Sequence, residues 1–224
     1  MAPEGSKKEQ RLVVRAFIQA RMSSKRFPGK VLAPLLGRPM IMHVISRVQE
    51  VIPAERVVVA TSTEATDDPL ACYLKDQGIG VFRGDLDNVA RRFQACLEEH
   101  PCAWFFRVCA DSPLLDSALL SRALSYTNVP EVDLITNVHP RTFPPGQSVE
   151  LLRAETFAGL DFEGLNPEER EHLTKVYYNH PQRYKIINFE SDDRGLAGEK
   201  LAVDTVGDLE RLEERFSRLR QRLG

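Results

Sequence analysis

Leu12-Val-Val-Arg-Ala-Phe-Ile-Gln19 is a short run of branched and aromatic apolar residues, and the basic stretch Ala20-Arg-Met-Ser-Ser-Lys-Arg-Phe-Pro-Gly-Lys30 follows it directly. An apolar run of this length, bounded by a loop, predicts a buried β-strand. Residues 39–51 then carry apolar side chains at helical spacing, with Pro39 suited to the first turn. Strand, basic loop and helix in this order indicate the start of an α/β fold.

The same alternation of strand and helix continues as far as residue 126. We expect further strands at 56–61, 80–82 and 103–108, and helices at 69–77, 88–99 and 117–126. Regular alternation predicts one mostly parallel sheet with helices on both faces, which is a three-layer α/β/α, Rossmann-like arrangement. Ligands of such sheets bind beyond the carboxyl ends of the strands.

The alternation breaks down after residue 132. A strand at 133–136 and an alternating segment at 148–152 predict a hairpin, and helices are expected at 154–159 and 167–179. We therefore expect an inserted hairpin and helix region at 137–182.

The last part of the chain returns to simple elements. Strands are expected at 184–189 and 200–203, followed by a charged amphipathic helix at 205–222. Thr205 suits the N-cap of this helix, and Asp208 stands at the capping-box position. We expect residues 1–11 to be a disordered tail and residues 12–224 to form a single domain.

The composition excludes several classes of protein. Thirty basic and 32 acidic residues give a formal charge of -2, so no overall positive field favours nucleic acid. The four cysteines show neither a CxxC pair nor histidines at zinc-ligand spacing. The first residues are polar and Arg15 interrupts the apolar run that follows, so we expect neither a signal peptide nor a membrane span. We predict a cytoplasmic protein without nucleic-acid or membrane partners.

The basic stretch after the first strand has the chemistry of a polyphosphate site. Arg21, Lys25, Arg26 and Lys30 lie within ten residues, interleaved with two hydroxyls and closed by Pro28-Gly29. Arginine forks, lysine charges and loop N–H groups match phosphate oxygens. The stretch is not a Walker A loop, and a GxGxxG fingerprint is absent. The alternative is a solvated basic loop.

Two aspartates follow other predicted strands at the same edge of the sheet. Asp111 comes just after the strand at 103–108, and Asp204 follows the strand at 200–203. Carboxylates that face a polyphosphate need a divalent cation between them, and Mg²⁺ uses one or two carboxylates plus phosphate oxygens. The alternatives are a turn residue before Pro113 for Asp111 and a helix-entry residue for Asp204.

A series of short motifs supports a more specific interpretation. They are Ile18-Gln-Ala-Arg-Met22, Lys25-Arg-Phe-Pro-Gly-Lys30, Val58-Val-Ala-Thr-Ser62, Arg83-Gly84, Asp87-Asn-Val89, Ala110-Asp-Ser-Pro-Leu114, Arg141-Thr-Phe-Pro144, Glu169-Arg-Glu-His172 and Val203-Asp-Thr205. In this order they resemble the cytidylyltransferase family, which includes spore-coat polysaccharide synthesis proteins and CMP-sugar synthetases. The sequence departs from the family pattern at Ser23, a common glycine, and at Gln147-Ser148, where Leu-Asp is common.

The resemblance implies a nucleotide-diphospho-sugar transferase fold and a role for each matching residue. The catalytic residues would be Arg21, Lys30 and Asp111; the nucleotide would contact Arg21, Ser24, Arg26, Lys30, Gly84 and Asp87; the sugar would contact Arg141, Glu150 and His172; and Mg²⁺ would bind Asp111 and Asp204. Asp111 suits a base as well as a metal ligand. The segment 137–182 resembles the dimerisation region of CMP-sugar synthetases, which implies a homodimer.

The implied reaction joins the CMP part of CTP to a sugar, such as a 2-keto sugar acid or a related surface-polysaccharide sugar, and releases pyrophosphate. One rival is a metal-dependent glycosyltransferase, suggested by the DxD at Asp85-Leu-Asp87. This DxD directly precedes the helix at 88–99, so helix capping explains it as well. The other rival is a catalytically silent nucleotide-binding regulator.

Overall fold

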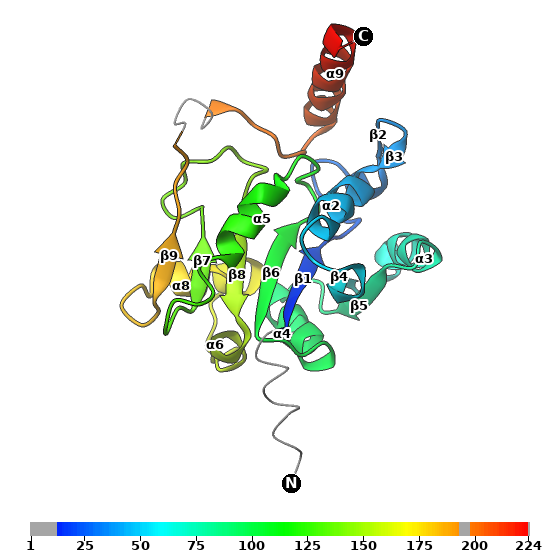
Figure 1. Cartoon of the computed structure of the whole chain (residues 1–224). Coiled ribbons are helices and arrows are strands. Elements are labelled where there is room, and N and C mark those ends of the chain that lie inside the picture. Colours follow the sequence, from blue (N-terminus) through cyan, green and yellow to red (C-terminus); the bar gives the residue numbers. More distant parts are fainter. Residues whose placement is uncertain (1–12, 193–197, 224) are drawn as a thin grey trace.

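A computed structural model of the chain describes residues 13–192 and 198–223, so the tail expected at 1–11 lies outside the described residues. Seven strands form the main sheet (Figure 1). In spatial order they are β5 (Gly80–Gly84), β4 (Val57–Ser62), β1 (Val14–Gln19), β6 (Trp104–Cys109), β8 (Glu150–Arg153), β7 (Leu134–Thr136) and β9 (Ile186–Asn188).

The sheet is mostly parallel, as predicted. β1 pairs in parallel with β4 and β6, β4 with β5, and β7 with β9, whereas β8 runs antiparallel to both of its neighbours. The hairpin expected around the insertion is thus formed by β7 and β8, and β8 lies inside the main sheet. The segment 137–182 therefore contributes a strand to the centre of the fold.

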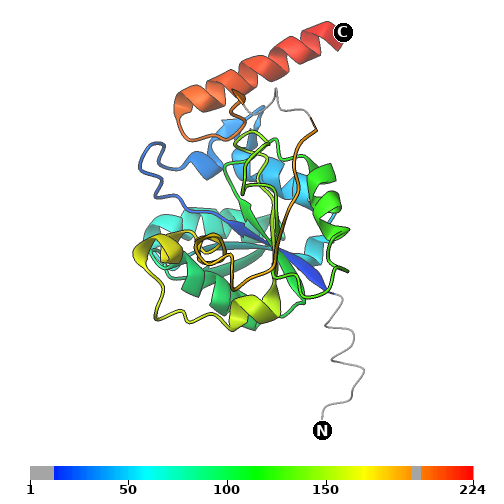
Figure 2. The ribbon, with the colours of Figure 1, turned by 90° about the vertical axis from the view of Figure 1, so that its left-hand side faces the viewer.

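Helices cover both faces of the sheet (Figure 2), which confirms the three-layer prediction. One face packs against α2 (Met40–Gln49), α3 (Asp68–Asp76) and α5 (Ser117–Leu124), and the other against α4 (Val89–Glu99), α6 (Ala154–Ala158) and α8 (Lys175–Asn179). Successive residues of a strand point to opposite faces. Accordingly, Ala16 and Ile18 of β1 belong to the first core cluster and Phe17 belongs to the second.

Short elements outside the sheet were not foreseen. They are the two-stranded ribbon of β2 (Pro34–Leu35) and β3 (Arg38–Pro39), and the 3₁₀ helices η1 (Lys30–Leu32), η2 (Ala54–Arg56) and η3 (Ala65–Asp67). The helix expected at 167–179 is two helices, α7 (Pro167–Glu171) and α8, because the backbone leaves helical geometry at His172. None of the described helices is long and apolar enough to cross a membrane.

The strand expected at 200–203 does not form. This segment crosses two loops, so its N–H groups bond to loop carbonyls: Leu201 to Pro145 at 2.7 Å and Val203 to Asp111 at 2.8 Å. The final helix, α9 (Val206–Leu223), follows and projects from the body (Figure 1). Its capping box matches the prediction, because the Thr205 hydroxyl accepts the Asp208 N–H and the Asp208 carboxylate accepts the Thr205 N–H.

Gly146 lets the segment before α9 lie against the loop that follows Pro144. Its φ is 100°, in the region that favours glycine. A β-carbon there would lie 2.5 Å from the Leu201 carbonyl carbon and 2.6 Å from the Ala202 nitrogen. Both neighbours are backbone atoms, so a side chain at this position would displace the segment.

We predict that Gly146→Ala lowers the free energy of unfolding by about 3 kcal/mol, because it combines overpacking with an unfavourable φ. Gly37→Ala is the matched control, since Gly37 has a φ of 81° but no atom near its added β-carbon. Strain alone gives this control a cost of about 1 kcal/mol. Urea unfolding of both variants measures the difference, and equal losses would contradict the tight approach.

Candidate active site

A cavity of about 370 Å³ lies beyond the carboxyl ends of β1 and β6, where the sequence predicted a ligand site. Seven of the predicted site residues line it: Arg21, Ser24, Arg26, Lys30, Asp111, His172 and Asp204. The unpredicted residues Gln19, Arg107 and Cys109 also line it. The cavity therefore combines the basic loop, both aspartates and one residue of the expected sugar site.

The basic loop is closed by its own backbone. The Gly29 N–H donates to the Met22 carbonyl at 2.8 Å, and Gly29 adopts a φ of 74° that a residue with a side chain rarely takes. The 3₁₀ helix η1 begins at the next residue, Lys30. This closure brings the two ends of the loop, next to Arg21 and Lys30, close together.

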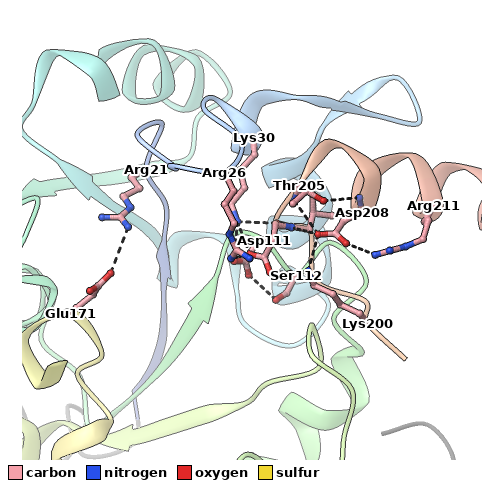
Figure 3. Close-up of polar contacts among 12 residues, drawn as sticks. Arg21, Arg26, Lys30, Asp111, Ser112, Glu171, Lys200, Thr205, Asp208 and Arg211 are labelled. Carbon is pink, nitrogen blue, oxygen red and sulfur yellow. Dashed lines mark hydrogen bonds and ion pairs between the residues drawn. The ribbon is translucent and has the colours of Figure 1, made fainter. Parts of the chain in front are cut away.

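Lys30 contacts both aspartates, and Figure 3 shows it beside Asp111. Its ammonium nitrogen lies 3.1 Å from Asp111 Oδ2 and 3.6 Å from Asp204 Oδ1, and it donates to the Val203 carbonyl at 2.8 Å. The side chain is 12% exposed, so these contacts are largely shielded from solvent. The structure thus brings the two aspartates to one point, although the strand expected before Asp204 is absent.

Asp204 is surrounded by positive charge. Besides Lys30, it pairs with Arg26 at 2.8 Å and with Lys200 at 2.9 Å. Burial alone would raise the pKa of Asp204, but the hydrogen bond from Lys200 and the charges of Lys30 and Arg26 hold it below its ordinary value. Asp204 is therefore ionised at neutral pH.

Asp208 holds the backbone of Asp204 in place. Its Oδ2 accepts hydrogen bonds from the N–H groups of Asp204 and Thr205. It also accepts one from the Lys200 ammonium, and Figure 3 shows Asp208 beside Thr205 and Lys200. The sequence pattern predicted only a capping role for Asp208 and no role for Lys200. Through the capping box, the Asp208 carboxylate therefore holds the backbone that carries Asp204.

The donor set suits a metal ion that arrives with phosphates. Asp111 and Asp204 are two carboxylates with one cation, the Lys30 ammonium, between them. The part of the chain that the structure describes contains no group of three or more histidine, cysteine or acidic residues that could hold a metal. Two carboxylates with phosphate oxygens are the usual Mg²⁺ environment, whereas a resident metal cage has more protein ligands.

Arg107 forms the floor of the cavity and was missed by the sequence analysis. It donates to Glu150 Oε2 at 2.8 Å and, through Nε and Nη2, to the side-chain oxygen of Gln19. Burial alone would raise the pKa of Glu150, but the charge of Arg107 lowers it below its ordinary value. Glu150, predicted to contact the sugar, therefore acts on the cavity through Arg107. An arginine within the apolar run of β6 was the available signal.

At the mouth of the cavity, Arg21 faces Glu171 at 3.7 Å (Figure 3). Glu171 is the last residue of α7, and His172 follows it where the helix ends. The break between α7 and α8 therefore brings His172 to the cavity. Glu171 was not singled out as a site residue, although it lies within the motif that contains His172.

Gly84, Asp87 and Arg141 do not line the cavity formed by the described residues. The Arg141 guanidinium donates to the Ser148 hydroxyl at 3.1 Å in an exposed loop. Gln147, where the sequence departs from the family pattern, is buried. Its side chain accepts the Asp116 N–H and donates to the Leu114 carbonyl, and so fixes the turn after Asp111.

The DxD before α4 forms the turn that leads into the helix, but the helix cap expected there is the next residue, Asn88. Asp85 Oδ1 accepts the N–H groups of Asp87 and Asn88, and Asn88 caps the helix. Arg92, which is 1% exposed, holds the same turn through the carbonyls of Asp85 and Leu86. One carboxylate oxygen of the DxD is therefore used within the turn itself.

Comparisons with known proteins agree with this geometry. The profile of the family described as cytidylyltransferase matches residues 16–214. The spore coat polysaccharide biosynthesis protein SpsF of Bacillus subtilis (strain 168) is 30% identical over 92% of this chain and 87% of its own. A cytidylyltransferase structure from Leptospira borgpetersenii is 28% identical, with a TM-score of 0.86 over 92% of this chain and 87% of the other.

A more distant structure shares the fold. The CMP:2-keto-3-deoxy-manno-octonic acid synthetase complexed with CTP is 19% identical, with a TM-score of 0.69 over 92% of this chain and 98% of the other. With a profile match over most of its length and a basic loop facing two carboxylates, the chain belongs to the cytidylyltransferase family and is a nucleotidyltransferase.

Proposed function

We propose that the enzyme transfers CMP from CTP to a hydroxyl group of a sugar and releases pyrophosphate. The observation that carries this proposal is the meeting of the basic loop with Asp111 and Asp204 in one cavity. A triphosphate supplies the negative charge that the loop cations require. The carboxylates supply the ligands that Mg²⁺ takes beside phosphate oxygens.

The basic loop would hold the triphosphate by exchanging partners. Arg21 contacts Glu171, and Lys30 contacts the two aspartates. When Arg21, Arg26 and Lys30 turn to the phosphates, Asp111 loses its cation and Asp204 keeps only its pair with Lys200. Both carboxylates would then be left to hold Mg²⁺. Bound there, Mg²⁺ would offset the repulsion between carboxylates and phosphates and polarise the α-phosphate.

The chemical step is an in-line displacement at the α-phosphorus. The acceptor oxygen forms a bond to this phosphorus, the bond to the bridging β-phosphate oxygen breaks, and the hydroxyl proton passes to Asp111 or to solvent. Arg21 and Lys30 stabilise the charge that collects on pyrophosphate. This chemistry consists mainly of positioning and electrostatic stabilisation.

The floor of the cavity supports an acidic acceptor such as a 2-keto sugar acid. Arg107 uses part of its five N–H groups on Gln19 and Glu150, so donors remain for a carboxylate. His172 lines the same cavity. The structurally similar synthetase is named for such an acid, 2-keto-3-deoxy-manno-octonic acid.

The test of this proposal is pyrophosphate release over the four nucleoside triphosphates, each with a panel of acidic and neutral sugars. CTP with an acidic sugar should give the highest turnover. Release of a nucleoside diphosphate from a sugar nucleotide would instead support the alternative function, a glycosyltransferase. No turnover with any pair would refute the proposed function.

Lys30→Ala should weaken CTP binding much more than CMP binding, because Lys30 is expected to contact the β- and γ-phosphates that CMP lacks. A buried charge-assisted contact of this kind is worth about 2 kcal/mol, or roughly thirtyfold in affinity. Calorimetry with both nucleotides measures the effect, and Lys75→Ala on the exposed side of α3 is the control. Equal losses for CTP and CMP would place the triphosphate elsewhere.

Asp111→Asn and Asp204→Asn should each reduce turnover by about a hundredfold, the scale of losing roughly 3 kcal/mol of transition-state stabilisation. The double variant should be little worse than the worse single variant, because groups that hold one ion act as a unit. Rates at saturating CTP over a Mg²⁺ titration test this, with exposed Asp76→Asn as control. Multiplicative losses would mean that the two aspartates act independently.

We also propose that the enzyme is a homodimer whose contact includes surface residues of the segment 137–182. Sedimentation at micromolar concentration should then give about twice the 25.3 kDa mass of the chain. A monomer under these conditions would remove this assignment.

A further inference from the structure

Asp67 is a buried carboxylate that the proposed reaction does not use. It ends the 3₁₀ helix η3, lies directly before α3 and is 0% exposed. An aspartate in this place usually caps the helix that follows it. The Asp67 side chain does not cap α3, so its two oxygens serve another purpose.

Both oxygens accept hydrogen bonds from neighbouring segments. Oδ2 accepts from the Thr61 hydroxyl at 2.9 Å and from the N–H and hydroxyl of Ser62 at 3.0 and 2.5 Å, all at the end of β4. Oδ1 accepts the Met22 N–H at 2.7 Å. Burial alone would raise the pKa of Asp67, but the hydrogen bonds from Ser62, Met22 and Thr61 lower it below its ordinary value.

Met22 lies at the neck of the basic loop, which is the point where the two ends of the loop meet. Its N–H is held by Asp67, and its carbonyl accepts the Gly29 N–H that closes the loop. Within the described chain, the bond from Asp67 is the only hydrogen bond between a side chain and the backbone of residues 21–30. Arg21 precedes Met22 directly, and the loop between Met22 and Gly29 carries Ser24 and Arg26.

We propose that Asp67 is a positioning residue that fixes the neck of the basic loop and so presents its cations to the triphosphate of CTP. This inference rests on the proposed function for the loop's ligand, but the tether itself is independent of any ligand. A loop that is already ordered loses less conformational freedom when it binds, so a fixed neck favours nucleotide binding. It also keeps the cations within the narrow tolerance that catalysis requires.

The competing interpretation is that Asp67 only braces the end of β4 against α3. The three bonds to Thr61 and Ser62 would serve that purpose without the bond to Met22. The two roles differ in what they affect. Loss of a brace lowers stability, whereas loss of the tether loosens the basic loop.

Asp67→Asn separates these roles, because an amide has one accepting oxygen. That oxygen is expected to stay with the three donors of β4, which leaves the NH₂ group facing the Met22 N–H, donor against donor. The control is Asp68→Asn at the next position, where an exposed carboxylate pairs with Arg83. Both variants remove one negative charge from the same part of the chain.

The experiment compares hydrogen exchange of residues 21–30, without nucleotide, with kcat and KM for CTP. We expect Asp67→Asn to speed exchange in this segment about tenfold or more and to lower kcat/KM by roughly ten- to a hundredfold, chiefly through KM. Asp68→Asn should change neither quantity. Exchange and kcat/KM that match the control, whatever happens to the melting temperature, would overturn the proposal.

If Asp67→Asn fails to fold, two further measurements still test the proposal. Thr61→Val removes one bracing bond but keeps the Met22 bond, so it should lower the melting temperature without changing exchange in residues 21–30. In the wild-type protein the Met22 amide should exchange as slowly as amides of β1, and fast exchange there would overturn the tether. If the wild-type protein releases no pyrophosphate from CTP, the proposed function fails, while these exchange measurements still decide the tether.

Discussion

The ammonium of Lys30 lies between Asp111, Asp204 and the Val203 carbonyl, and the architecture of the site depends on this contact. It joins the start of η1, the loop after β6 and the segment before α9, which come from three distant parts of the sequence. The last of these segments has no strand to hold it. Its place is set by this charge, by two backbone hydrogen bonds and by the close approach to Gly146.

In the free cavity, three cations of the basic loop are paired with carboxylates. Arg21 has Glu171, Lys30 has its two aspartates, and Arg26 has Asp204. These charges are paired before a ligand arrives, so binding exchanges one set of partners for another. The free energy gained with a triphosphate is therefore a difference between two paired states, which makes affinity sensitive to the charge of the ligand.

Much of the fold follows from apolar patterning alone. The runs that became β1, β4 and β6 are short and apolar on both faces, as buried parallel strands are. The same patterning wrongly predicted a strand at 200–203, because most residues of this segment are apolar. Val203 packs with Leu35 and Met40 in a small separate cluster, so its burial is achieved without pairing to any strand.

The sequence predicted the site residues that lie within one loop or directly after a strand. It did not predict those that meet only because two strands pair in a particular register. Arg107 stands opposite Glu150 in the β6–β8 pairing. No local pattern reveals that pairing, because β8 enters the sheet antiparallel from a distant segment. The anchor formed by Asp67 escaped notice for a similar reason, since its partner Met22 belongs to another strand's loop.

The order of the strands along the chain has a consequence for biosynthesis. The last strand of the sheet, β9, ends at Asn188, whereas Asp204 and the capping box that holds it come later. Because a ribosome releases residues from the first to the last, every strand of the sheet is available for folding before the second carboxylate has emerged. A nascent chain can thus complete its sheet while still lacking Asp204 and the part of the cavity wall that this residue forms.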